Sequence, residues 1–96
     1  MKMIMIAYNV AIDEEVMEAV SSAGLDCYTK WAKVHGRGRL SKPHLGTHVW
    51  PGWNNVILLA ADDEKVHPLL EGVRELRRTL GKEGVKAFVL PVEEVT

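Results

Sequence analysis

The chain is poor in cysteine, in long apolar runs and in surplus charge of either sign, and each shortage excludes a class of protein. Its single cysteine, Cys27, cannot form an internal disulfide, so a reducing cytoplasm is the simplest location. Apolar runs such as residues 56–61 are far shorter than the roughly 20 residues that span a bilayer, and the first residues lack a signal-peptide pattern. We therefore expect a cytoplasmic protein without membrane insertion.

Charge and composition narrow the class further. Lysine and arginine number 12 against 13 aspartates and glutamates, which gives a net charge of −1. A nonspecific nucleic-acid binder needs a basic excess to displace counterions, so no nucleic-acid partner is expected. With 47% hydrophobic and 26% charged residues, the 96 residues are typical of one small globular domain with a thin core. We expect residues 1–96 to form a single domain.

The hydrophobic periodicity changes several times along the chain and predicts six regular elements. Residues 2–10 have the β-formers of a strand, and Asp13 is placed to cap a helix that ends before Gly24. The helical spacing is strongest before Leu80, where Gly72 indicates a close contact between this helix and a sheet. The predicted elements are strands at 2–10, 26–34, 56–61 and 85–92, a first helix at about 14–23, and a second helix that Asp62 and Asp63 open and that Gly81 and Gly84 end. A long loop at 36–55, whose base either stays irregular or extends the flanking strands, completes the chain.

The order β-α-β-β-α-β predicts an α+β fold. Two β-α-β units in tandem with right-handed crossovers give a four-stranded antiparallel sheet with both helices on one face, which is the ferredoxin-like arrangement. Residues 3–10 and 56–61 are apolar on both faces of their strands. A sheet face left in water should alternate with polar residues instead, so we expect an oligomer that packs its open sheet faces together.

Two glycine-rich segments carry a resemblance to a known family. Residues 81–95 read Gly-Lys-Glu-Gly-Val-Lys-Ala-Phe-Val-Leu-Pro-Val-Glu-Glu-Val. They resemble the B-loop and following strand of the nitrogen regulatory PII signalling proteins, which read Gly-Lys-x-Gly-Asp-Gly-Lys-Ile-Phe-Val before a similar Pro-Val-Glu-Glu run. Residues 34–39 read Val-His-Gly-Arg-Gly-Arg and resemble the Val-x-Gly-x-Gly-Arg at the foot of the PII T-loop. The similarity runs in register over nearly the whole chain.

The resemblance implies a PII-like regulatory protein that is not an enzyme. It implies a homotrimer that binds a small anionic effector between subunits and signals through residues 36–55 to a regulated enzyme or transporter. Adenine nucleotides (ATP, ADP or AMP) are the candidate ligands. Glycine amides and cationic side chains suit such an anion on chemical grounds as well. The ligand-binding residues carried over by position are Gly36, Gly38 and Arg39 at the T-loop base, and Gly81, Lys82, Gly84 and Lys86 in the B-loop.

The chain also departs from the PII pattern. The B-loop is one residue shorter, and Val85 stands where the family has the glycine before the lysine. A β-branched residue does not readily take a positive φ, so the nest of main-chain amides is expected to be incomplete. The T-loop is shorter, and the chain lacks the family's C-terminal segment with its phosphate-holding arginines.

An alternative interpretation is a trimeric metal-binding protein similar to the CutA proteins, which share the fold. His44 and His48 in the long loop are its candidate metal ligands, with Cys27 as a soft third ligand for copper or zinc. A divalent metal would then be the cofactor. The simpler interpretation gives the loop histidines ordinary hydrogen bonds and makes Cys27 a small core hydrophobe. Catalysis is not expected, because Cys27 with a histidine is the single candidate couple and no spacing places the two together.

Two side-chain clusters leave alternatives open. Trp50 and Trp53 flank Pro51-Gly52 in the long loop and, with Trp31, would stack on a planar ligand or pack against a neighbouring subunit. The arginines and glutamates of the second helix recur at helical spacing and are interpreted as a solvated charged face. The members of this face are Arg74, Arg77, Arg78, Glu71 and Glu75.

Overall fold

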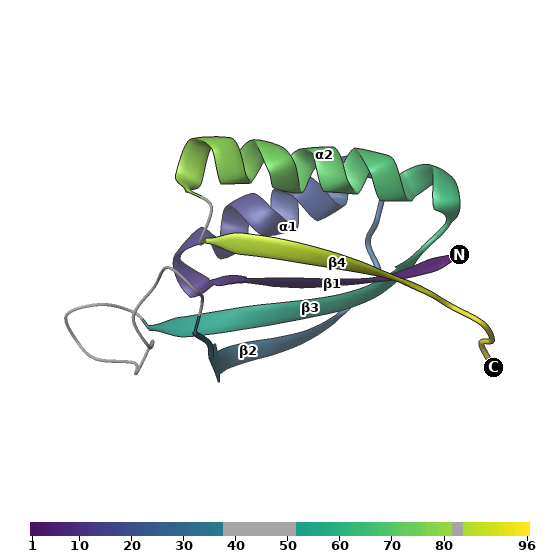
Figure 1. Cartoon of the computed structure of the whole chain (residues 1–96), viewed down its shortest axis with the longest axis horizontal. Coiled ribbons are helices and arrows are strands. Elements are labelled where there is room, and N and C mark those ends of the chain that lie inside the picture. The colour runs from purple at the N-terminus through teal and green to yellow at the C-terminus, as the bar shows by residue number, and fades with distance from the viewer. Residues whose placement is uncertain (38–51, 82–83) are drawn as a thin grey trace.

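The computed structural model describes residues 1–37, 52–81 and 84–96. Its elements are β1 (Lys2–Asn9), the short 3-10 helix η1 (Val10–Ile12), α1 (Asp13–Ser22), β2 (Thr29–His35), β3 (Trp53–Ala61), α2 (Asp63–Leu80) and β4 (Val85–Pro91). Figure 1 shows the strands in one layer and both helices in a second layer on one face of the sheet. The ferredoxin-like α+β class predicted from the sequence is confirmed.

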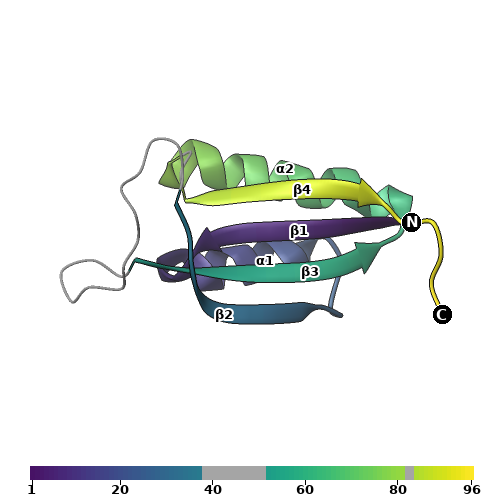
Figure 2. The same cartoon turned by 60° about the horizontal axis from the view of Figure 1, so that its bottom comes forward.

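The four strands form one antiparallel sheet in the order β2-β3-β1-β4. In β1, Lys2 lies opposite Ala61 of β3 and Pro91 of β4, and the pairing continues without a break to Tyr8. The strands of the two β-α-β units interleave, since β3 lies between β1 and β2, and β1 lies between β3 and β4 (Figure 2). As a result, β2 and β4 form the two outer edges of the sheet.

The core lies between the sheet and the helices. Alternate residues of β1 and β3 face the helices, and each helix contributes a buried stripe of aliphatic side chains. Burial of one such side chain contributes about 1.5–3 kcal/mol, so this single layer is the main source of stability. The buried hydrophobic residues are Ile4, Ile6, Tyr8, Val16, Val20, Leu25, Ile57, Leu59, Ala61, Leu69, Val73 and Val85.

The opposite face of the sheet carries no helix among the described residues and is strongly apolar. We call it the open face. Trp31 is 48% exposed there, Phe88 46% and Leu90 45%, which is high for such large apolar side chains. The prediction of strands that are apolar on both faces is therefore confirmed. By the strand register, the open face carries the polar side chains of Thr29 and Lys86 at its edges, and its apolar members are Met3, Met5, Ala7, Trp31, Val56, Leu58, Ala60, Phe88 and Leu90.

The start of α1 differs from the prediction. The 3-10 turn of η1 precedes the helix, and the Asn9 side chain caps that turn by accepting from the main-chain N–H of Ala11 at 2.9 Å. Asp13 is the first residue of α1 and does not cap it. Its carboxylate instead bonds to side chains of β1, β2 and β3. The capping role predicted for Asp13 is wrong, because these partners compete successfully for the same oxygen.

The strand boundaries shift in the middle of the chain. β2 begins at Thr29, three residues later than predicted, and β3 begins at Trp53 rather than at residue 56. Residues 53–55, predicted as part of the loop, are therefore strand. Asn54 and Asn55 have low β-propensity, but their ladder partners in β1 and β2 hold them extended.

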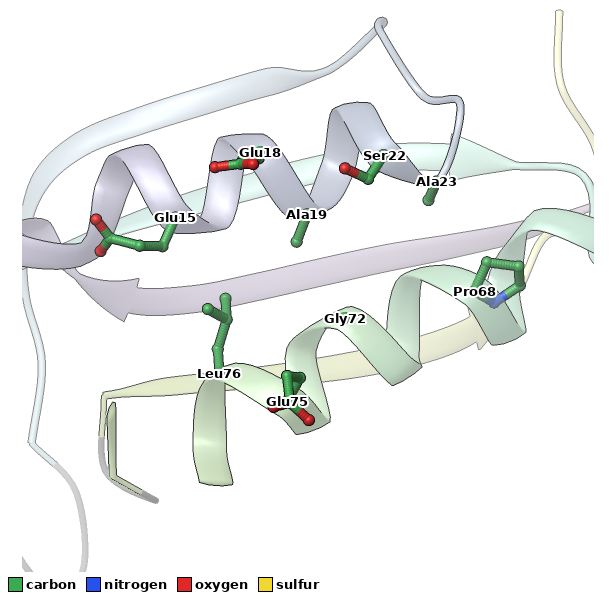
Figure 3. A pocket seen from close by; sticks show the side chains of 9 residues that line it. All are labelled: Glu15, Glu18, Ala19, Ser22, Ala23, Pro68, Gly72, Glu75 and Leu76. Atoms are coloured by element: carbon green, nitrogen blue, oxygen red, sulfur yellow. The ribbon is translucent and has the colours of Figure 1, made fainter. Parts of the chain in front are cut away.

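The two helices approach each other closely at Gly72. A Cβ added there would lie 3.3 Å from the Cβ of Ala19 in α1. The close contact predicted for Gly72 is therefore real, but it is made with the other helix and not with the sheet. Figure 3 shows these two residues facing each other, with Leu76 directed toward α1.

We predict that residue size at position 72 controls the stability of the helix pair. Gly72→Leu forces α1 and α2 apart and should lower the free energy of unfolding by about 1–3 kcal/mol. Gly72→Ala adds one methyl group, and its gain of about 1 kcal/mol in helix propensity should offset most of the crowding. Urea denaturation of both variants measures the difference. Equal stability of the Ala and Leu variants would contradict the close contact.

Candidate ligand-binding site at the loop end of the sheet

One end of the sheet gathers the glycine-rich segments found in the sequence. There β1 and β2 finish, at Asn9 and His35, and β3 and β4 begin, at Trp53 and Val85. We call this the loop end. Gly36 directly follows β2 at one edge of this end, and Gly84 directly precedes β4 at the other edge.

At the β2 edge, a bulge sets the direction of the chain. The pairing of β2 with β3 shifts between Trp31 and Val34, and Lys33 adopts a left-handed φ of 57°. The side-chain oxygen of Asn55 accepts from the main-chain N–H of Lys33 at 2.9 Å. A non-glycine residue in this region is uncommon and needs such support. The buried Asn55 therefore holds the bulge that leads into Gly36.

Asp13 anchors Asn55 from the other side. One carboxylate oxygen of Asp13 accepts from the Tyr8 hydroxyl at 2.5 Å, from Nδ2 of Asn55 at 3.1 Å, and from Nζ of Lys30 at 2.6 Å. A network in which every donor has this acceptor is stiffer than separate pairs. It ties the start of α1 to three strands and fixes the base of the loop.

The same network shifts two pKa values. Burial raises the pKa of Tyr8 well above its usual value, and the hydrogen bond to the Asp13 carboxylate raises it further. Burial alone would also raise the pKa of Asp13, but the hydrogen bonds from Lys30, Tyr8 and Asn55 together outweigh it and hold that pKa below its usual value. At neutral pH the network therefore contains an anionic Asp13 and a neutral Tyr8.

Gly36 lies where no side chain fits without a rearrangement. A Cβ added at Gly36 would come within 2.0 Å of Nδ2 of Asn54. The neighbouring rings of His35 and Trp53 lie 4.5 Å apart between centroids and tilted by 42°. The base of the loop is thus packed side chain against main chain, and any side chain at position 36 would require the Asn54 amide to move.

At the β4 edge, Gly81 directly follows α2 and Gly84 directly precedes β4. Gly81 takes a left-handed φ of 102°, and the N–H of Gly84 lies 3.4 Å from the Gly81 carbonyl oxygen. The carbonyl of Gly84 accepts from the Asn9 N–H at 2.9 Å. Val85 is 2% exposed and already belongs to β4. Valine at position 85, where the PII pattern has glycine, therefore begins β4 and places its side chain in the core.

Lys86 is the first exposed cation of β4. It lies opposite Ala7, on the open face, and its Nζ is 5.6 Å from the centroid of the Phe88 ring. The side chain is exposed, so the ammonium remains available to a ligand or a neighbouring copy. A cation over an aromatic face keeps its charge while losing some of its freedom.

The predicted site residues divide between the two edges of the loop end. Gly36 lies at the β2 edge, and Gly81, Gly84 and Lys86 lie at the β4 edge. Because β3 and β1 run between these edges, about 14 Å of sheet separates the two groups. One chain does not bring them together around a small molecule. The predicted residues Gly38, Arg39, Lys82, His44 and His48 lie outside the described residues.

Two grooves of opposite charge flank the helices. One of about 320 Å³ lies between α1 and α2 and is rimmed by the carboxylates of Glu15, Glu18 and Glu75, which disfavour an anion (Figure 3). The other, of about 270 Å³, lies between α2 and β4. Its charged lining residues are Arg74, Arg77 and Lys86. Glu71 pairs with Arg74 at 2.7 Å and offsets its charge, so Arg77 and Lys86 are the lining cations that favour an anion at the β4 edge.

The described residues contain no group of three or more potential metal ligands among His, Cys, Asp and Glu. Cys27 is exposed before β2, at the opposite end of that strand from the loop end, so its interpretation as a core hydrophobe is wrong. Among the described helices, none is long and apolar enough to cross a membrane.

The comparisons with known proteins identify the family. The model of the nitrogen regulatory protein P-II family matches residues 1–96. The chain belongs to this family, whose members are regulatory proteins. The match gives no support to the CutA alternative. A search of curated protein sequences found no significant match.

Solved structures of PII-like proteins share the fold. CPII from Thiomonas intermedia K12 bound to ADP and bicarbonate superposes with a TM-score of 0.74 at 25% identity, over 92% of this chain and 81% of that one. A second CPII structure, bound to ADP, AMP and bicarbonate, has a TM-score of 0.74 at 23% identity and covers 99% and 92% of the two chains. A putative PII-like signalling protein from Thermus thermophilus superposes with a TM-score of 0.66 at 22% identity, over 92% of this chain and 82% of that one.

We predict that the Asp13 network makes stability depend on pH in a defined direction. Because the pKa of Asp13 is lowered in the folded chain, its contribution is complete above the unfolded pKa, about 3.9, and is lost as the pH falls through the lower folded value. Asp13→Asn should therefore destabilise the protein by about 1–3 kcal/mol at pH 7 and by less at pH 3, which lies below the unfolded pKa. Urea unfolding at both pH values measures the two differences.

Glu14→Gln is the matched control, since Glu14 is an exposed carboxylate in the same first turn of α1. It removes a similar charge from the helix N-terminus but no part of the network. A stability loss in Asp13→Asn that stays constant with pH, or that Glu14→Gln reproduces, would contradict this account.

Proposed function

We propose that this protein is a homotrimeric PII-like regulator that binds a small anionic ligand, an adenine nucleotide, in clefts between subunits. Residues 1–96 act as one domain, and residues 36–55 carry the signal to a regulated enzyme or transporter in the cytoplasm. The protein acts by binding and not by catalysis. The observation that carries the proposal is the division of the site: its two glycine-rich segments lie at one end of the sheet but on opposite edges.

A cleft between two copies resolves this division. The β2 edge of one copy can face the β4 edge of the next, which brings Gly36 of one chain near Gly84 and Lys86 of another. Glycine main chain allows a phosphate to approach closely, and Lys86 supplies a charge-assisted hydrogen bond. Gly38, Arg39, Gly81 and Lys82 complete the proposed set. The ligands of the CPII structures, which are ADP, AMP and bicarbonate, support an anion of this kind.

The open face supports assembly as a trimer. Its apolar side chains come from all four strands and would remain in water in an isolated chain. Contiguous apolar patches of this extent on soluble proteins mark interaction surfaces. The packing of three open faces around a common axis would cover them and would align the sheet edges that form the clefts. Trp31, which lies on this face, then packs against a neighbouring subunit.

We predict that one charge on the open face prevents assembly without unfolding the chain. Met5 lies on the central strand β1 and is 37% exposed, so Met5→Glu leaves the helix-side core intact. In a trimer the same carboxylate would be buried without a partner, at a cost of several kcal/mol. Sedimentation velocity at micromolar concentration should show a trimer for the native chain and a monomer for the variant.

Ser21→Glu is the control, because it adds the same charge on the exposed surface of α1 and should leave the trimer intact. Circular dichroism checks that both variants are folded. A native chain that sediments as a well-folded monomer would remove both the trimer and the proposed clefts.

We predict that ADP binds and that Lys86 contributes to its affinity. Removal of one charge-assisted contact in Lys86→Ala should weaken binding by about 1.5–3 kcal/mol, which is roughly 10- to 150-fold. Lys2→Ala is the control, since Lys2 lies at the opposite end of the neighbouring strand β1. Calorimetry with ADP, AMP, ATP and bicarbonate measures the affinities. If none of the four binds below millimolar concentration, the chain keeps the family's fold without the proposed ligand.

A further inference from the structure

Arg77 stands apart from the other arginines of α2. Arg74 pairs with Glu71 at 2.7 Å and Arg78 with Glu75 at 2.5 Å, and both arginines are exposed, as expected for a solvated charged face. Arg77 is half-buried, and its Nη1 donates to the main-chain carbonyl oxygen of Val85 at 2.5 Å. The three arginines therefore do not form one charged face, and Arg77 has a different role.

The Val85 carbonyl is available because of the strand register. The bond from the Asn9 N–H to the Gly84 carbonyl shows that this carbonyl points toward β1. Alternation along the strand then turns the carbonyl of Val85 outward, to the free edge of the sheet. Arg77 reaches over this edge from the last turns of α2 and satisfies the outward carbonyl with a charged donor.

This bond ties the end of α2 to the start of β4. It joins a residue three positions before the helix end to the first residue of the strand. Gly84 and Lys86 lie on either side of the carbonyl that Arg77 holds. A fixed Val85 main chain therefore sets the positions of the Gly84 amide and of the Lys86 side chain.

We infer that Arg77 is a positioning residue for residues 84–86, a described part of the proposed anion site at the β4 edge. The inference rests on the proposed function. Arg77 acts through Val85 and does not itself touch the ligand. A positioned segment binds more tightly than a mobile one, because less conformational entropy is lost on binding.

The test compares two arginines of the same helix. Arg77→Met keeps the apolar stem and removes the donors, and it should weaken ADP binding by about tenfold, equivalent to about 1.4 kcal/mol. Arg74→Met removes the same charge from the preceding turn of α2 and from the lining of the same groove. It should change the affinity for ADP less than twofold. Arg77→Lys keeps a donor for the carbonyl and should recover most of the affinity. Thermal denaturation confirms that each variant is folded.

Two further measurements separate positioning from direct contact and from general stability. Amide hydrogen exchange at residues 84–86 should accelerate in Arg77→Met without ligand and remain native in Arg74→Met. The salt dependence of ADP binding should fall in Lys86→Met, which loses a ligand contact, and stay native in Arg77→Met.

The outcomes separate the two proposals. If the native chain binds ADP and Arg77→Met binds it with the affinity of the native chain or of Arg74→Met, the positioning role is overturned. The proposed function then remains intact. If the salt dependence of ADP binding falls in Arg77→Met as it does in Lys86→Met, Arg77 contacts the ligand directly, and the positioning role is again overturned. A native chain that binds no nucleotide overturns the proposed function, and the inference fails with it.

Discussion

In the described part of the chain, helices cover one face of the sheet and leave the other open. The rest of this structure depends on that constraint. Two helices suffice to bury the side of the sheet that carries Ile4, Ile6 and Ile57, and a chain of this length builds a single core layer. The other side is equally rich in apolar residues. Under the proposed function, the stability of the chain and its assembly are therefore linked, because an apolar surface of this kind is covered most simply by other copies of itself.

The same constraint explains why the candidate site is divided. Interleaved β-α-β units place β2 and β4 at opposite edges, while antiparallel pairing returns all the glycine-rich connections to one end of the sheet. The two groups of residues thus share an end but not an edge. Under the proposed function, ligand binding would report on the contact between two subunits, since neither half is complete in one chain. Such a site couples a small molecule to quaternary structure without a separate relay.

The sequence predicted the elements better than their contacts. Periodicity located both helices and all four strands because it reflects burial on one face, which the fold satisfies. Gly72 was correctly identified as a close-approach position, but spacing carries no information on which neighbour approaches, and the neighbour is Ala19 of α1. Asp13 was correctly placed at a helix start and assigned the wrong partners. Its true partners lie on strands 5, 17 and 42 residues away along the chain, at distances that local rules do not reach.

The features that the sequence did not reveal share a physical cause. The left-handed Lys33 depends on the side chain of Asn55, and the half-buried Arg77 depends on a main-chain carbonyl of β4. A main-chain acceptor has no signature in the amino-acid sequence, so Arg77 was indistinguishable from Arg74 and Arg78 by spacing. The resemblance to the PII family located the segments 36–39 and 81–86, but it could not show how this chain supports them.

Neither the main-chain conformation nor the packing of a single chain explains the glycine at position 84. Within the described residues, positive φ occurs only at Gly24, Lys33 and Gly81, so Gly84 does not use the conformational freedom of glycine. A Cβ added at Gly84 would lie 3.6 Å from Ile12, an ordinary contact, so the chain itself has room for a side chain there. What remains is the bare main chain that glycine presents to a group arriving from outside. In the proposed cleft that group is the ligand, and Gly84, held next to the buried Val85, would offer it bare main chain in a fixed position.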